Sequence, residues 1–262
     1  MAIFSRGMDS RSPGSWLIAL MLMLAGVLGT PNSKAADNEA LFAPYAALLD
    51  ASVENGWVDY AAFKQSDAFA AMVREIGTTP LSSGLSRDER LATFINAYNV
   101  LSIQGILDGF SPSSVFSRLR FFKRREYEVF GSSMTLYELE HKRIISEGDP
   151  RIHFAIVCSS KSCPPLISEL YLPETLDTQL DQVAANFINN PASNSFDRSS
   201  NEATLSRIFK WYRDEFEAQA GSLAAYLARY VSDPELKQSL LRDDWSFGYH
   251  DYDWSLNGSP AS

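Results

Sequence analysis

The feature that most constrains the fold is one long helical segment, residues 86–109. It opens with the capping box SRDE, in which Ser86 and Glu89 can satisfy each other's backbone amides. Apolar side chains then recur at helical spacing up to Gly109, namely Leu91, Phe94, Ile95, Tyr98 and Leu101. Because an apolar stripe has to be buried, we expect this helix to pack against the rest of the domain.

The remaining pattern predicts an α+β domain in which helices pack on a small mixed sheet. Helical spacing and capping signals predict further helices at 38–54, 67–76, 135–147, 174–188, 209–216, 223–230 and after Asp233-Pro234. Short extended segments are expected at 57–60 and, as a strand–turn–strand, at 126–135. The Asn- and Ser-rich residues 189–203 predict a loop.

Two segments are predicted to form the main strands. Residues 151–157, RIHFAIV, are nearly all apolar or β-branched, which is typical of a central strand covered on both faces. The alternating aromatics of residues 245–257 predict a C-terminal closing strand. In the predicted central strand, Cys158 would lie on the face opposite His153 and about 16 Å along it. A contact between these two residues therefore requires the chain to fold back after Cys158.

The N-terminus predicts export. Two arginines precede a 14-residue apolar run from Trp16 to Gly29, and small Ser33 and Ala35 fit the −3 and −1 positions of a cleavage site. The run is shorter than the about 20 residues of a membrane span. Residues 1–35 are thus predicted to be a secretory signal peptide, with an uncleaved anchor as the less favoured alternative. We expect a periplasmic or secreted protein with no membrane span after cleavage.

Composition narrows the function further. The signal peptide carries three of the 23 Lys and Arg and one of the 32 Asp and Glu, so the rest of the chain has a formal charge of −11. This acidic balance argues against general binding to nucleic acid or to anionic membranes. Residues 36–84 are expected to be a helical lead-in packed on the same domain as residues 85–257.

One basic run stands out from this acidic background. RLRFFKRR, residues 118–125, holds five of the 20 cationic side chains that remain after cleavage. It is either a solvated face, which is the usual role of such a run, or the receptor of an anionic group such as the phosphate or carboxylate of an envelope polymer.

The stretch RIHFAIVCSSKSCPP brings together the residues best suited to chemistry. Cys158 and Cys163 form a disulfide in one interpretation, as is common in oxidising compartments. In a second, Cys158 is a nucleophilic thiol activated by a nearby imidazole. In a third, His153, both cysteines and His141 hold zinc, although the spacing between the ligands is long for such a site.

Further candidates lie on the predicted helices. Asn96 and Asn99 emerge on one side of the long helix, where they either brace a neighbouring loop or orient a substrate or an imidazole. Glu140 and His141 are adjacent on a helix and point about 100° apart, so each needs a partner from elsewhere.

Several of these motifs carry a family resemblance. FINAYNVLSIQGIL, TLYELEH, DPRIHFAIVCSSKSCPP, LSRIFKWYRDEF and YDWSLN, in this order, resemble the bacterial members of domain-of-unknown-function family 547. The resemblance covers roughly residues 85–257. It implies a site at Asn96, Tyr98, Asn99, Glu140, His141, His153, Cys158 and Cys163. It implies no reaction, because the family as a whole has no assigned activity.

Together these observations favour a thiol-dependent hydrolase or transferase acting on an amide, thioester or peptide-like bond. Cys158 would attack, His153 or His141 would accept its proton, and Asn96, Asn99 or Glu140 would orient the imidazole or stabilise charge. Cys163 would be a resolving partner. No cofactor is expected. The rival prediction is a non-catalytic envelope binding or assembly module with a structural Cys158–Cys163 disulfide. The expected partner is a small-molecule or peptide-like substrate, or an envelope protein.

Overall fold

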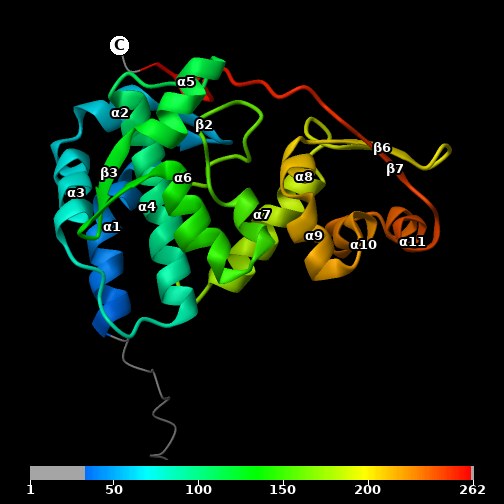
Figure 1. Cartoon of the computed structure of the whole chain (residues 1–262), viewed down its shortest axis with the longest axis horizontal. Helices are drawn as coiled ribbons and strands as arrows, with labels where there is room; N and C mark the ends of the chain where they lie inside the picture. Colours follow the sequence, from blue (N-terminus) through cyan, green and yellow to red (C-terminus); the bar gives the residue numbers. More distant parts are fainter. Residues whose placement is uncertain (1–32, 261–262) are drawn as a thin grey trace, which may run out of the picture. The chain divides into compact units, whose positions relative to one another are not determined.

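Helix α4 (Arg87–Leu107) is the central element of the computed structural model, which describes residues 33–260 (Figure 1). Its predicted capping box is confirmed: the Glu89 amide donates to Ser86 Oγ at 3.1 Å, and the Ser86 amide donates to Glu89 Oε2 at 2.6 Å. Every residue from 91 to 103 is buried. The helix is therefore covered on all sides, beyond what its apolar stripe predicted.

Two apolar clusters meet at α4. One contains side chains of α1 (Ser33–Ser52), α2 (Tyr60–Gln65) and α3 (Asp67–Thr78), together with Ala97 and Val100 of α4. The other contains Leu91 and Phe94 of α4 and the apolar residues of the segments that follow. These segments include the helices α7 (Leu176–Ile188), α9 (Arg213–Ala220), α10 (Leu223–Tyr230) and α11 (Pro234–Arg242). The first cluster thus contains residues of both the lead-in and the main domain.

The strands form three small sheets. Strands β1 (Val53–Glu54) and β2 (Trp57–Asp59) are antiparallel, and β8 (Gly258–Ser259) joins β2 in parallel. Strands β3 (Glu126–Val129) and β4 (Ser132–Thr135) form the predicted hairpin. Strand β6 (Glu202–Leu205) pairs antiparallel with β5 (Ser195–Asp197) and parallel with β7 (Ser246–Tyr249). The α+β class is confirmed, with the sheet divided into three parts.

The predicted central strand at 151–157 is wrong. Its first part is a 3₁₀ helix, η4 (Pro150–Phe154), and no residue of 151–157 belongs to a strand. Asp149 caps this helix by accepting from the Arg151 amide at 3.1 Å, and Pro150 occupies its first turn, where its missing N–H costs nothing. The apolar character of this segment did predict its burial, since residues 152–157 are all buried. Burial on all sides does not distinguish a strand from a short helix.

The predicted closing strand is partly confirmed. Within 245–257 only β7 is a strand, and the chain then runs back extended to β8, with one bridge from Leu256 to Ser160 (Figure 1). The predicted loop at 189–203 contains β5 and the first residues of β6.

Short helices complete the fold. Helix α5 (Val115–Leu119) continues into the π-helical segment η1 (Arg120–Arg124). The second predicted capping box, at Thr135 and Glu138, is confirmed, and it opens α6 (Leu136–Leu139). Helix α6 continues into the π-helical η2 (Glu140–Ile144) and the 3₁₀ helix η3 (Ile145–Glu147), and α8 (Ile208–Trp211) precedes α9.

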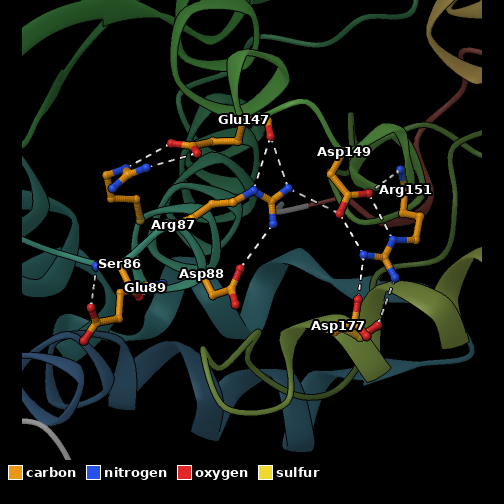
Figure 2. Close-up of polar contacts among 9 residues, drawn as sticks. Ser86, Arg87, Asp88, Glu89, Glu147, Asp149, Arg151 and Asp177 are labelled. Carbon is orange, nitrogen blue, oxygen red and sulfur yellow. Dashed lines mark hydrogen bonds and ion pairs between the residues drawn. The ribbon is translucent and has the colours of Figure 1, made fainter. Parts of the chain in front are cut away.

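An ion-pair network fastens the start of α4 to η4 and α7 (Figure 2). Arg90 forms a two-pronged pair with Glu147 at 3.0 and 3.1 Å. Arg151 contacts Asp149 at 2.8 Å and also reaches Asp177 and Asp181 on α7, each at 2.8 Å. These contacts hold η4, and the buried segment after it, in a fixed place beside α4.

The predicted signal peptide lies mostly outside the described residues, which begin at residue 33. From residue 33 to residue 260, no helix has both the length and the apolar character to cross a membrane.

Candidate functional site

A cavity of about 570 Å³ opens among segments that are far apart in the sequence. Its walls come from α5 and η1, from α6 and η2, from η4 and the loop after it, from α8, and from the C-terminal segment. Its lining residues are Tyr98, Arg118, Phe122, Lys123, Tyr137, Glu140, His141, His153, Ile156, Cys158, Cys163, Pro164, Ile208, Trp211, Tyr212, Tyr252 and Trp254. Two histidines and both cysteines of the chain therefore share one hollow.

Both π-helical segments contribute to this cavity. Lys123 lies in η1, and Glu140 and His141 lie in η2. A π-helical turn widens the backbone by one residue and shifts the direction of the side chains that follow, which is why such turns recur at functional sites.

Asn99 positions the backbone that leads to Cys158. Its amide nitrogen donates to the Ala155 carbonyl at 3.0 Å, and its amide oxygen accepts from the Val157 amide at 2.8 Å. The buried backbone of this segment is thus paired with a side chain instead of a neighbouring strand. The bracing interpretation of Asn99 is the one that the structure supports.

The chain turns sharply directly after Cys158. Ser159 has φ of +59°, a left-handed conformation that costs energy for a residue other than glycine. The Ser159 hydroxyl lies 3.0 Å from Ser102 on α4, and its carbonyl accepts from the Asn257 amide at 3.3 Å. The turn continues to Cys163, whose amide donates to the Ser160 carbonyl at 3.1 Å. This fold-back is the one that a contact between Cys158 and other site residues requires.

The two sulfur atoms end up side by side. Cys158 and Cys163 are free thiols, with their Sγ atoms 2.7 Å apart, farther than the about 2.05 Å of a disulfide bond. The Cys158 amide also donates to Cys163 Sγ at 2.9 Å. Ser160 Oγ and the Tyr252 hydroxyl lie 3.1 and 3.4 Å from Cys158 Sγ.

These neighbours make the two thiols unequal. Burial by itself raises the pKa of Cys158, but hydrogen bonds with Cys163, Ser160 and Tyr252 outweigh burial and hold that pKa below its ordinary value. Burial and the adjacent Cys158 both raise the pKa of Cys163. Cys158 is therefore the sulfur that ionises first, and Cys163 remains a protonated donor beside it.

His141 is arranged as a proton acceptor. Its Nδ1 lies 3.0 Å from the Tyr137 carbonyl, which fixes Nδ1 as the protonated nitrogen and leaves Nε2 as an acceptor. Its ring stacks on the Tyr137 ring with centroids 3.9 Å apart. Partial burial keeps the pKa of His141 below its ordinary value, against the opposite effect of the Tyr137 carbonyl. The imidazole is thus neutral near pH 7.

His153 is held more tightly than His141. Its Nε2 lies 3.0 Å from Glu215 Oε2 on α9, and its ring stacks on Tyr212 with centroids 3.5 Å apart. Its Nδ1 is buried and has no hydrogen-bond partner among the described residues. A buried polar atom without a partner is uncommon in folded proteins and is often found at functional sites.

Glu140 is a buried carboxyl group in the wall of the cavity. Tyr212 donates to Glu140 Oε1 at 2.6 Å. Burial raises the pKa of Glu140, although hydrogen bonds from Tyr212 and Tyr98 act in the opposite direction. As expected, Glu140 has no role in orienting its neighbour His141.

Five of the seven predicted site residues meet in the cavity, namely Cys158, Cys163, His141, His153 and Glu140. Asn99 lies behind the wall, and Asn96 brackets the Tyr171 backbone, with its nitrogen 2.8 Å from the carbonyl and its oxygen 3.1 Å from the amide. Both amides therefore brace backbone groups, which is one of the two predicted interpretations, and neither Asn96 nor Asn99 lines the cavity. Within residues 33–260, no three His, Cys, Asp or Glu side chains gather as a metal site, so the zinc interpretation finds no ligand set.

Sequence reasoning missed half of the cavity. The sequence assigns no site role to Tyr212, Tyr252 or Trp254, which line the cavity, or to Glu215, which contacts His153. The rings of Trp211, Tyr252 and Trp254 lie 4.4 to 5.7 Å from one another and form an aromatic wall. The high content of aromatic residues in the two motifs after residue 204, LSRIFKWYRDEF and YDWSLN, is the sequence feature that could have indicated this wall.

The comparisons with known proteins find a similarity over one part of the chain. Residues 82–188 match the family model described as "Protein of unknown function, DUF547". The matched residues include both cysteines, His141, His153, Arg118 and Lys123, whereas Trp211, Tyr212 and Tyr252 follow them. No curated protein and no solved structure matches the chain.

Proposed function

We propose that this chain is an exported, thiol-dependent hydrolase or transferase that acts on an amide, thioester or peptide-like bond. The observation that carries the proposal is the inequality of the two cysteines: the pKa of Cys158 is held below its ordinary value, and Cys158 lines the same cavity as His141, whose neutral imidazole has an acceptor nitrogen at Nε2. A thiolate is the form of cysteine that attacks a carbonyl.

The reaction follows from these groups. Cys158 passes its proton to His141 Nε2, and the thiolate sulfur forms a bond to the carbonyl carbon of the substrate. The imidazolium then protonates the leaving nitrogen, oxygen or sulfur as its bond to carbon breaks, which leaves a thioester on Cys158. Water or an acceptor nucleophile loses a proton to the same imidazole, attacks the thioester and releases Cys158.

Two groups support the charged states of this path. Burial and the nearby Cys158 raise the pKa of Tyr252, so its hydroxyl stays protonated and can donate to a developing oxyanion. His153, paired with Glu215 and stacked on Tyr212, is the second candidate base, and its unpartnered Nδ1 favours it.

The test is the reactivity of each thiol in protein taken from its own compartment, with the alkylated cysteine identified by mass spectrometry. We expect Cys158 alone to react quickly with iodoacetamide near pH 7, and a panel of amide and thioester substrates to be cleaved by the wild type and spared by C158A. Two thiols that react only after reduction, with no turnover of the panel, would overturn the proposal.

That second result would favour the rival function, an envelope binding or assembly module with a Cys158–Cys163 disulfide. The 2.7 Å between the sulfur atoms supports this alternative, because the bond would form with little movement of the backbone.

A further inference from the structure

The basic run of residues 118–125 divides into two groups. Arg118 and Lys123 line the cavity, and they are the only Lys or Arg side chains that do so among the described residues. Arg120 and Arg124 are exposed and do not line it, and Arg125 pairs with Asp108. Part of the run is thus the solvated face that such runs usually form, and part is aimed at the site.

A chain of ring contacts joins Arg118 to the sulfur. The Arg118 guanidinium lies 4.6 Å from the centroid of the Trp254 ring, and this ring lies 4.4 Å from that of Tyr252. The Tyr252 hydroxyl is the one that lies 3.4 Å from Cys158 Sγ. The guanidinium therefore stands two aromatic rings away from the thiol, and cation–π contact holds it in place.

A second chain of contacts joins Lys123 to the base. The Lys123 ammonium lies 4.2 Å from the centroid of the Tyr137 ring, and this ring stacks on His141 at 3.9 Å. Both cations come from the continuous segment α5–η1, so this one segment places positive charge along two walls of the cavity.

The charge balance of the cavity is opposite to that of the chain. The whole sequence has a formal charge of −9, yet the only carboxyl among the lining residues is the buried Glu140. Burial favours the uncharged form of that carboxyl. Neither Arg118 nor Lys123 forms an ion pair with a carboxylate among the described residues, so both cations are available to an anion, and the planar fork of Arg118 matches a carboxylate.

We infer that the substrate carries a carboxylate, held by Arg118 and Lys123 and separated from the scissile carbonyl by a segment that lies on the aromatic wall. This inference rests on the proposed function, since it takes Cys158 as the reacting atom. The class it names is an acidic acyl or peptide-like compound.

The experiment compares two alkylating reagents of the same shape and different charge. Iodoacetate and iodoacetamide both react by displacement of iodide by the Cys158 sulfur to form a thioether, but only iodoacetate is an anion. The ratio of their rate constants at Cys158, divided by the same ratio for N-acetylcysteine amide, measures the local field. We expect this normalised ratio to be about 3 to 10 at low salt and to approach one near 1 M salt.

The variants show where the effect arises. R118Q and K123Q should each lower the ratio, and the double variant should bring it to one or below, because the net negative charge of the chain then dominates. R118K, which keeps the charge, should retain most of the ratio. R124Q is the matched control on the same segment, outside the cavity, and should leave the ratio unchanged. A wild-type ratio of one or less, or an equal loss in R124Q, overturns the inference.

A second readout does not depend on thiol chemistry. Iodide should quench the tryptophan fluorescence more strongly, relative to neutral acrylamide, in the wild type than in the R118Q/K123Q double variant. If neither reagent alkylates Cys158, the proposed thiol function fails; a quenching ratio that is the same in both proteins refutes the cationic site itself.

Discussion

Two regions of this protein are rich in ionisable side chains, and they differ in how completely these groups are paired. In the network around η4, each arginine meets its carboxylates directly: Arg151 touches Asp149 and Asp177 (Figure 2), and it also touches Asp181. In the cavity, His153 Nδ1 has no partner among the described residues, and Arg118 and Lys123 face aromatic rings. Groups that already have all their partners have little capacity left to bind a ligand. Groups without ionic or hydrogen-bond partners can still bind one.

The two regions are connected through one short segment. The network fixes η4, and Asn99 fixes residues 155–157, which lead directly to Cys158. The network therefore contributes to the cavity by holding the backbone before Cys158 rigid, because a reactive group needs a well-fixed backbone. Variants in the network should change stability, and variants in the cavity should change reactivity.

The largest effect is expected from Cys158→Ala. Turnover of any substrate found with the panel should fall by about 10³-fold or more, because the attacking atom is removed. The melting temperature should remain close to that of the wild type, because the side chain is half-buried and small. Cys163→Ala is the matched control and should retain measurable turnover. Equal turnover in C158A and the wild type would break the distinction between the two regions.

The next effect is expected from Arg151→Met in the network. The substitution leaves the buried Asp149 without its main partner and should lower the free energy of unfolding by about 3 kcal/mol. Urea denaturation measures the loss. Alkylation of Cys158 at a temperature where the variant is folded should proceed at the wild-type rate. The exposed pair of Lys142 and Glu138 supplies the control, since K142M removes a solvent-screened ion pair and should lower the free energy of unfolding far less than R151M.

His141→Asn tests the base. The asparagine amide can still donate to the Tyr137 carbonyl, but it offers no basic nitrogen, so kcat should fall by about 10²-fold with little change in KM. The pH profile should also change: the wild type should gain activity as pH rises through a His141 pKa that lies below the ordinary value, and the variant should lack this limb. If H141N keeps both kcat and the profile, His153 is the base to test next.

The smallest effect is a pH dependence of stability. Hydrogen bonds and charge from Arg151 more than offset burial and hold the pKa of Asp149 below its ordinary value. The resulting stability is fully present above the unfolded pKa of about 3.9 and is lost as pH falls through the folded pKa. The difference in unfolding free energy between the wild type and Asp149→Asn should therefore shrink below about pH 4. A constant difference down to pH 2 would contradict the ion-pair assignment.

Local signals in the sequence predicted local structure well. The capping boxes at Ser86 and Thr135 and the hairpin at 126–135 depend on residues close in the chain, and all three are confirmed. The run at 151–157 was misread because its apolar character reports burial, which a 3₁₀ helix and a strand share.

The site shows the same division. The sequence by itself pointed to Cys158, Cys163, His141 and His153, because cysteine and histidine are scarce in this chain and chemically distinctive, and to Glu140 as the neighbour of His141. Only the tertiary structure showed that Asn96 and Asn99 bind backbone groups, that Glu215 contacts His153, and that Tyr212, Tyr252 and Trp254 complete the walls. The sequence showed that Arg118 and Lys123 are charged, but it did not show that their side chains line the cavity. The contacts of Asn96, Asn99, His153 and Arg118 join residues more than 50 positions apart, and no spacing rule reaches across that distance; they exist only once the whole chain has packed around α4.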